Sequence, residues 1–152
     1  MSYTTRPAVT DDTEVIARYN QAMAKETEGK SLSLGTLSAG VRRVFDEPAH
    51  GRYLVAEDGS GLVVGCLLIT YEWSDWRNGQ VWWVQSVYVH PEHRRRGVFK
   101  KLYAEVRRLG DAAGGVCGYR LYVERDNRRA QQTYQQLGMS PTPYLLFEDM
   151  FG

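Results

Sequence analysis

A chain of 152 residues with 43% hydrophobic residues has the size and composition of one domain with one core. Its 19 basic and 18 acidic residues nearly balance, which disfavours nucleic-acid and membrane partners. The longest apolar run, Leu62 to Ile69, is too short to span a bilayer, which needs about 20 residues. Two cysteines and no apolar leader fit a reducing compartment. We therefore expect one soluble, cytoplasmic domain over residues 1–152, without membrane or nucleic-acid partners.

The first third of the chain predicts a strand and two helices. Residues 4–9 are expected to form a short strand, and Thr10 or Asp11 can cap a helix that runs to about Lys25. The Gly-, Ser- and Thr-rich stretch from Gly29 to Gly40 predicts a loose connection. A second, short helix is expected to follow it, over residues 41–45.

The middle of the chain predicts three antiparallel strands. Residues 52–57 read as a strand, 58–61 as a turn, and 62–71 as a strand that is apolar on both faces. Asn78-Gly79 is a strong hairpin signal, so residues 80–89 should return antiparallel to the preceding strand.

The last third predicts two helices alternating with strands. An apolar stripe at helical spacing starts at Val98 and ends before Gly114, so a helix is expected there. A strand over 119–123, a helix over 127–137 and a last strand over 144–147 complete the expected order.

One segment combines the features of an anion-binding site. The strand ending at Val89 is followed by a basic turn, Arg94-Arg95-Arg96, and Gly97 opens the next helix. Such a helix start presents backbone N–H groups and a positive dipole end, and a phosphate can approach closely where glycine has no side chain. Between residues 90 and 108 there are seven Lys or Arg and two Glu, so the surrounding charge is positive. A compact polyanion is the expected ligand.

These elements resemble the GCN5-related N-acetyltransferase (GNAT) superfamily. Its cofactor motif, [RQ]xxGx[GA], is similar to residues 94–99, except that Phe99 stands where a second Gly or Ala is usual. The family's later Asn, Ala and Tyr on a helix resemble Asn127, Ala130 and Tyr134. The resemblance covers nearly the whole chain. It implies a mixed α/β (α+β) fold with a mostly antiparallel sheet of six to seven strands flanked by about four helices.

The resemblance also implies an activity and a cofactor site. The chain is expected to transfer an acetyl group from acetyl coenzyme A to a primary amine of a small molecule or peptide, by direct attack in a ternary complex. Backbone amides near Gly97 would bind the pyrophosphate of coenzyme A, and the end of the preceding strand would pair with the pantetheine arm. The implied cofactor-binding residues are Val87, Tyr88, Val89, Arg94, Arg95, Arg96, Gly97, Val98, Phe99, Lys100 and Asn127.

Tyr134 is the candidate catalytic residue, because a phenol is protonated at neutral pH and can donate a proton to the departing thiolate. The general base is left open. Many family members carry a Glu where this chain has Gln85, and an amide cannot accept a proton at physiological pH. Water, Glu28, Glu72 and His90 are the remaining candidates for the base.

The acceptor site is expected to combine aromatic and acidic residues. Trp73, Trp76, Trp82 and Trp83 precede the cofactor segment, and at least one of the last two should face the core. The others would favour an aromatic or cationic amine, and Glu26 and Glu28 would attract an ammonium group. The candidate substrate residues are Glu28, Trp73, Trp82 and Gln85.

Other functions fit less well. The main alternative is a catalytically weak GNAT-fold module that binds acetyl coenzyme A or a partner without turnover, as Gln85 would allow. A nucleic-acid binder using Arg94 to Arg96 is disfavoured by the balanced charge. Cys66 has no partnered His, and His90 and His93 lack further ligands, so neither a nucleophilic cysteine nor a metal site is expected. Homodimers are common in the family, although no self-complementary surface is evident in the sequence.

Overall fold

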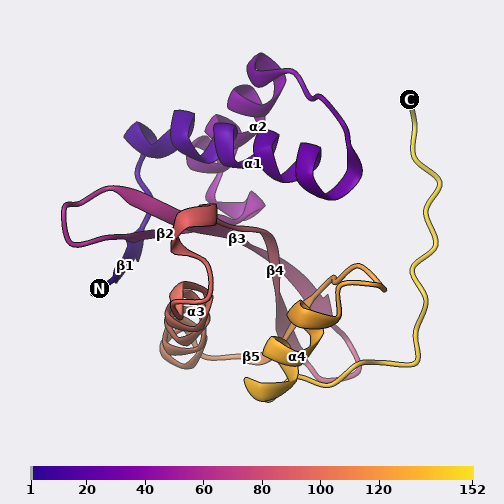
Figure 1. Ribbon diagram of the computed structural model, residues 1–152. Coiled ribbons are helices and arrows are strands. Elements are labelled where there is room, and N and C mark those ends of the chain that lie inside the picture. Colours follow the sequence, from indigo (N-terminus) through magenta and orange to yellow (C-terminus); the bar gives the residue numbers. More distant parts are fainter. Residues whose placement is uncertain (1) are drawn as a thin grey trace. The chain divides into compact units, whose positions relative to one another are not determined.

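The computed structural model describes residues 2–152 (Figure 1). The chain divides into two compact units, one ending at Tyr122 and the other comprising Val123–Gly152. Within residues 2–152, none of the helices has the length and apolar character of a membrane span.

The first unit is built on a five-stranded sheet in the order β1-β2-β3-β4-β5. The first four strands pair antiparallel with their neighbours, whereas β5 pairs parallel to β4. A helix connects β4 to β5, as a parallel pair requires. The strands are β1 (Thr4–Pro7), β2 (Arg52–Glu57), β3 (Val63–Ser74), β4 (Gly79–Val89) and β5 (Val116–Leu121).

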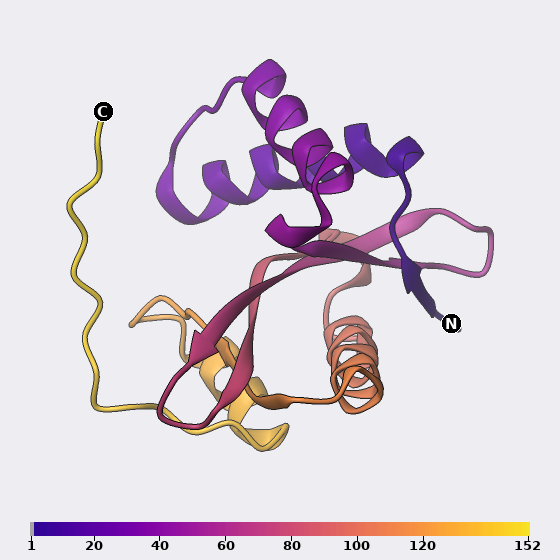
Figure 2. The ribbon, with the colours of Figure 1, turned by 180° about the vertical axis from the view of Figure 1, so that it is seen from behind.

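Helices cover both faces of this sheet (Figures 1 and 2). α1 (Thr13–Glu28) and α2 (Leu34–Asp46) lie on one face, and α3 (Val98–Ala113) lies on the other. Single-turn 3₁₀ helices η1 (Thr10–Asp12), η2 (Pro48–His50) and η3 (Pro91–His93) join the elements. The mixed α/β architecture expected from the sequence is therefore confirmed.

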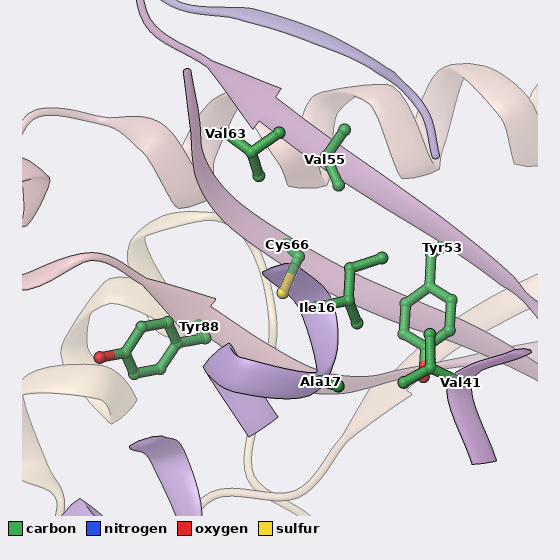
Figure 3. Close-up of a cluster of buried hydrophobic side chains, with 8 residues drawn as sticks. All are labelled: Ile16, Ala17, Val41, Tyr53, Val55, Val63, Cys66 and Tyr88. Atoms are coloured by element: carbon green, nitrogen blue, oxygen red, sulfur yellow. The ribbon is translucent and has the colours of Figure 1, made fainter. Parts of the chain in front are cut away.

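Alternation along the strands divides the core into two layers. On the α1 and α2 side, a buried cluster joins the two helices to three strands (Figure 3). Its members are Ile16, Ala17, Val41, Tyr53, Val55, Val63, Cys66 and Tyr88. On the other side, Leu102 and Val106 of α3 and Leu54 of β2 are fully buried. Tyr88 of this cluster anchors the end of β4 on the α1 and α2 side.

α2 begins earlier than the sequence predicted. The stretch from Gly29 to Gly40 was expected to be loose, yet the helix starts at Leu34 and includes both Gly35 and Gly40. The Ser33 side chain caps it by accepting a hydrogen bond from the N–H of Thr36 at 3.3 Å. Burial of apolar side chains against α1 outweighs the low helix propensity of glycine here.

The second unit contains α4 (Arg128–Gln136). Asn127 caps this helix, its side-chain oxygen accepting a hydrogen bond from the N–H of Ala130 at 3.1 Å. The predicted helix over 127–137 is confirmed within one residue at each end.

Two strand predictions need correction. The sheet has five strands in residues 2–152, not six to seven, because residues 144–147 form no strand. Those four side chains are 61–88% exposed. An apolar segment becomes a strand only where a neighbouring strand accepts its backbone groups, and the described residues supply none. β5 also begins and ends earlier than the predicted 119–123, at Val116–Leu121.

Candidate active site

β4 continues past the point where its pairing with β5 ends. The parallel ladder runs from Gln80↔Val116 to Val84↔Leu121. β4 then extends to Val89, and this end pairs with β3 on its other edge. In the described part of the chain, no strand pairs with the opposite edge over residues 85–89. That edge offers backbone donors and acceptors to an extended ligand.

A β-bulge bends β4 at this point. Leu68 pairs with Gln85 and Cys66 pairs with Tyr88, so Ser86 and Val87 both lie opposite Leu67. Ser86 has a φ of 51°, in the left-handed region that L-residues other than Asn and Asp seldom adopt. No glycine marks the bulge in the sequence, so residue patterns gave no signal of it.

The loop after β4 contains two residues with left-handed backbone geometry. Arg95 has a φ of 64° and Gly97 a φ of 80°, so two left-handed residues flank Arg96. Gly97 precedes α3, and the N–H of Lys101 donates to its carbonyl at 3.1 Å. The first turn of an α-helix has N–H groups without an intrahelical acceptor, and these favour an anion. A Cβ added at Gly97 would meet no atom within 4 Å, so this position faces open space.

The three arginines of this loop are placed differently. Arg94 forms an ion pair with Glu26 of α1, with 2.9 Å between Nη2 and Oε2. Arg95 and Arg96 are exposed, and neither forms an ion pair with any of residues 2–152. The positive field expected for a phosphate therefore comes from Arg95 and Arg96, together with the exposed Lys100.

Phe99 replaces the small residue that is usual in the motif. Its ring stacks on that of Tyr103 one turn further along α3, with centroids 5.9 Å apart and planes 13° apart. Tyr103 is buried and makes an edge contact with Tyr119 of β5. The bulky side chain is therefore half-buried along the helix.

A cavity of about 280 Å³, lined by both polar and apolar residues, lies on the α1 and α2 side of the bulge. Its polar lining includes Asn20, Thr27, Glu28 and Ser86, and its remaining lining residues are Met23, Ala24, Leu32 and Leu37. The Oδ1 atom of Asn20 is buried and accepts no hydrogen bond from the described residues. Sequence reasoning singled out Glu28, but it missed Asn20 and Ser86, because only the fold brings α1 beside the bulge.

Gln85 and Glu72 lie on the same face of the sheet as this cavity, and both are held by neighbours. The Gln85 amide donates to the hydroxyl of Thr70. The Glu72 carboxylate accepts from Trp83 Nε1 at 2.8 Å and from Arg120 Nη1 at 2.7 Å. The hydrogen bond from Trp83, followed by that from Arg120, lowers the pKa of Glu72. A carboxylate with a lowered pKa is a weaker base, so Glu72 is a poor candidate for that role.

The tryptophans predicted for the acceptor site separate. Trp82 is 2% exposed and contacts Tyr71 and Tyr119 on the α3 face. It is a core residue, and we do not retain it in the proposed acceptor site. Trp73, near the tip of the β3–β4 hairpin, is 63% exposed. Trp83 is half-buried on the face of the sheet that carries the cavity, and its ring packs against that of Tyr122 with centroids 4.7 Å apart.

The two remaining predicted residues belong to the second unit. Asn127 caps α4, and Tyr134 lies in the middle of that helix. Burial raises the pKa of Tyr134, which keeps the phenol protonated at neutral pH. A protonated phenol is the form that a general acid requires.

Comparison with known proteins identifies the family. The model of the Acetyltransferase (GNAT) family matches residues 19–139. A possible acetyltransferase from Clostridium difficile 630 is 40% identical, with 99% of each chain covered and a TM-score of 0.88. No curated protein sequence matches the chain. The protein belongs to the GNAT acetyltransferase family.

More distant structures share the fold. A GCN5-related N-acetyltransferase from Ralstonia eutropha JMP134 is 21% identical, with 97% of this chain and 99% of that chain covered and a TM-score of 0.79. AAC(6')-Iy, solved in complex with the bisubstrate analog CoA-S-monomethyl-acetylneamine, is 18% identical over the full length of both chains, with a TM-score of 0.78.

Proposed function

We propose that this protein is an acetyl-CoA-dependent N-acetyltransferase acting on a primary amine of a small molecule or peptide. The observation that carries the proposal is that the unpaired edge of β4 leads, through one short loop of the chain, to the N-terminus of α3. The edge of β4 suits an extended pantetheine arm, and the N-terminus of α3 suits a diphosphate. The family generally uses acetyl coenzyme A, and one relative in the fold was solved with a coenzyme A analog.

The proposed cofactor site comprises the edge of β4 and the loop from Arg95 to Lys100, and it refines the set of residues implied by the sequence. The Val89 carbonyl accepts a hydrogen bond from Arg94 Nε at 2.8 Å, so we centre the pantetheine contact on Val87. The pyrophosphate would bind the backbone from Arg95 to Lys100, with Arg95 and Arg96 supplying charge. Tyr88 would contribute through its backbone, because its side chain is buried in the cluster between the sheet and α1.

The acceptor would enter through the cavity beside the bulge. Glu28 supplies a negative charge there, and the buried Oδ1 of Asn20 is an acceptor that a bound N–H would satisfy. Both features favour an ammonium or amine group. Met23, Leu32 and Leu37 add apolar surface for a carbon stem.

The proposed reaction is direct acyl transfer. The neutral amine nitrogen attacks the carbonyl carbon of the thioester, a C–N bond forms and the C–S bond breaks. Tyr134 would donate a proton to the departing thiolate, and the base would accept the proton that the amine loses. Gln85 is an amide and Glu72 has a lowered pKa, so water, Glu28 or His90 serves as base.

One observation favours a second candidate, a module that binds acetyl coenzyme A or a partner without turnover. The side chain at the family's usual Glu position is Gln85, and it is engaged with Thr70. This alternative keeps the cofactor site and removes the chemistry.

Two measurements test the proposal in sequence. At about 100 times its dissociation constant, acetyl coenzyme A should add roughly 2.7 kcal/mol of stability and raise the melting temperature by several degrees. Release of free thiol in the presence of amines, aminoglycosides, amino acids or peptides would establish transfer. Stabilisation without thiol release for any acceptor favours the binding module, and no stabilisation contradicts the coenzyme A site that both candidates share.

A further inference from the structure

Glu26, on the last turn of α1, contacts both the end of β4 and the loop that follows it. Its Oε1 atom accepts a hydrogen bond from the Tyr88 hydroxyl at 3.1 Å. Its Oε2 atom accepts one from Arg94 Nη2 at 2.9 Å. A single carboxylate on a helix therefore joins two residues more than 60 positions away in the sequence.

Arg94 is held at three points. Its Nε donates to the carbonyl of Val89, its Nη2 donates to Glu26, and its guanidinium carbon lies 5.3 Å from the centre of the Tyr88 ring. The planar fork of arginine suits such simultaneous contacts, which a lysine ammonium cannot reproduce. Arg94 is also the first residue of the turn that leads to Gly97. Fixing its side chain fixes where that turn begins.

The Tyr88 side chain is a rigid base for this arrangement. It is 6% exposed, and its ring packs on Tyr19 with centroids 4.9 Å apart. Tyr19 is anchored in turn, since its hydroxyl donates to the carbonyl of Val63 at 2.6 Å. Burial, followed by the contact with Glu26, raises the pKa of Tyr88, so its hydroxyl remains a donor.

We propose that Glu26 is a positioning residue for the cofactor loop: it holds Arg94 against Val89 and Tyr88, and Arg94 acts as a clamp on the loop instead of a phosphate ligand. This inference rests on the proposed coenzyme A site. The guanidinium that the motif would assign to the phosphates is already neutralised by a carboxylate. The preformed loop then binds the diphosphate without first being ordered, which favours affinity.

An electrostatic role and a positioning role of Glu26 predict opposite changes in coenzyme A affinity for the same substitution. Glu26→Gln removes a negative charge near an anion-binding loop, so long-range electrostatics alone would tighten coenzyme A binding. If Glu26 positions Arg94, the same substitution loosens the loop and weakens binding. The direction of the change in affinity therefore separates the two roles.

The experiment is calorimetric titration of coenzyme A into the unmodified protein and a set of variants. Glu26→Gln and Arg94→Lys should each raise the dissociation constant by about tenfold, and the double variant should be no weaker than the weaker single one. Tyr88→Phe, which removes one donor to Glu26 but keeps the ring, should raise it by about two- to threefold. Glu14→Gln is the matched control, because Glu14 pairs with Arg18 on the exposed side of the same helix. Its affinity should equal that of the unmodified protein.

Several outcomes would overturn the inference. Glu26→Gln binding coenzyme A as tightly as the unmodified protein, or more tightly, contradicts positioning. So does Arg94→Lys with full affinity, or a double variant whose loss is the product of the single losses. A melting temperature of ligand-free Glu26→Gln far below that of Glu14→Gln would assign Glu26 to folding. If the unmodified chain does not bind coenzyme A, the proposed function itself fails, and that result is distinguishable because no variant is needed to see it.

Discussion

Val84 of β4 and Leu121 of β5 form the last pair of the parallel ladder between these strands. Beyond this pair β4 continues to Val89, whereas β5 ends, so the two strands separate within the sheet. The bulge at Ser86 turns β4 at the same place. The proposed binding site for the pantetheine arm is created by this parting.

Two substitutions of Gly97 distinguish the effect of backbone strain from the effect of charge in the proposed diphosphate site. Its φ of 80° is unfavourable for other residues, but an added Cβ meets nothing within 4 Å. Gly97→Ala should therefore cost about 1 kcal/mol of stability and have little further effect on affinity. Gly97→Asp adds a like charge where the diphosphate would bind, which costs several kcal/mol, so coenzyme A affinity should fall about 100-fold relative to Gly97→Ala. Calorimetry on both variants measures the difference, and equal affinities would contradict the site.

Tyr134→Phe tests the proposed proton donor. The substitution keeps the ring and removes the hydroxyl, so turnover should fall by about 100-fold or more while the dissociation constant of coenzyme A changes by less than about twofold. Thiol release with a competent amine reports the first quantity and calorimetry the second. Turnover equal to that of the unmodified protein would remove Tyr134 from the mechanism.

Asp12 should make stability depend on acid pH. Both its oxygens accept from Arg6, at 2.8 and 3.0 Å, and one also accepts from the N–H of Val9. The hydrogen bond from Arg6 is the main reason that the pKa of Asp12 is lowered from its ordinary 3.8. Because the folded pKa is the lower one, the stabilisation is complete above about pH 4 and is lost as the pH falls through the folded value.

The free energy of unfolding of Asp12→Asn should therefore be about 2 kcal/mol lower at pH 7 than that of the unmodified protein. The variant should also lose less stability on acidification. Urea unfolding at several pH values measures both effects. Glu14→Gln breaks an exposed pair and should change stability by less than about 0.5 kcal/mol. If the stability of Asp12→Asn and that of the unmodified protein fell equally with decreasing pH, Asp12 would not be the source of the acid dependence.

The two cysteines should differ in reactivity. Cys66 is fully buried, and burial raises its pKa to about 12, whereas Cys117 is exposed. A thiol-specific reagent at pH 8 should modify Cys117 in the folded protein and reach Cys66 only after unfolding. Cys117→Ser should show no reaction until denaturant is added, and it would also lower the background of thiol-release assays. Rapid modification of two thiols in the folded protein would contradict this prediction.

The fold was largely predictable because its signals are local. The Asn78-Gly79 turn, the apolar stripe that starts at Val98 and the glycines after α3 each specify structure through neighbouring residues. The motif from Arg94 to Phe99 likewise located the loop. The last predicted strand failed for the complementary reason: the apolar residues 144–147 suit a strand, but pairing depends on a partner elsewhere.

The sequence by itself determined the family, the order of the helices and most strands, and the position of the basic loop before α3. Only the tertiary structure decided that Ser86 forms a bulge, that Trp82 is buried while Trp83 is only half-buried, and that Glu26 pairs with Arg94. Periodicity and turn chemistry act between neighbours in the chain. The bulge, the burial and the ion pair depend instead on residues that meet only after the sheet and its helices have packed.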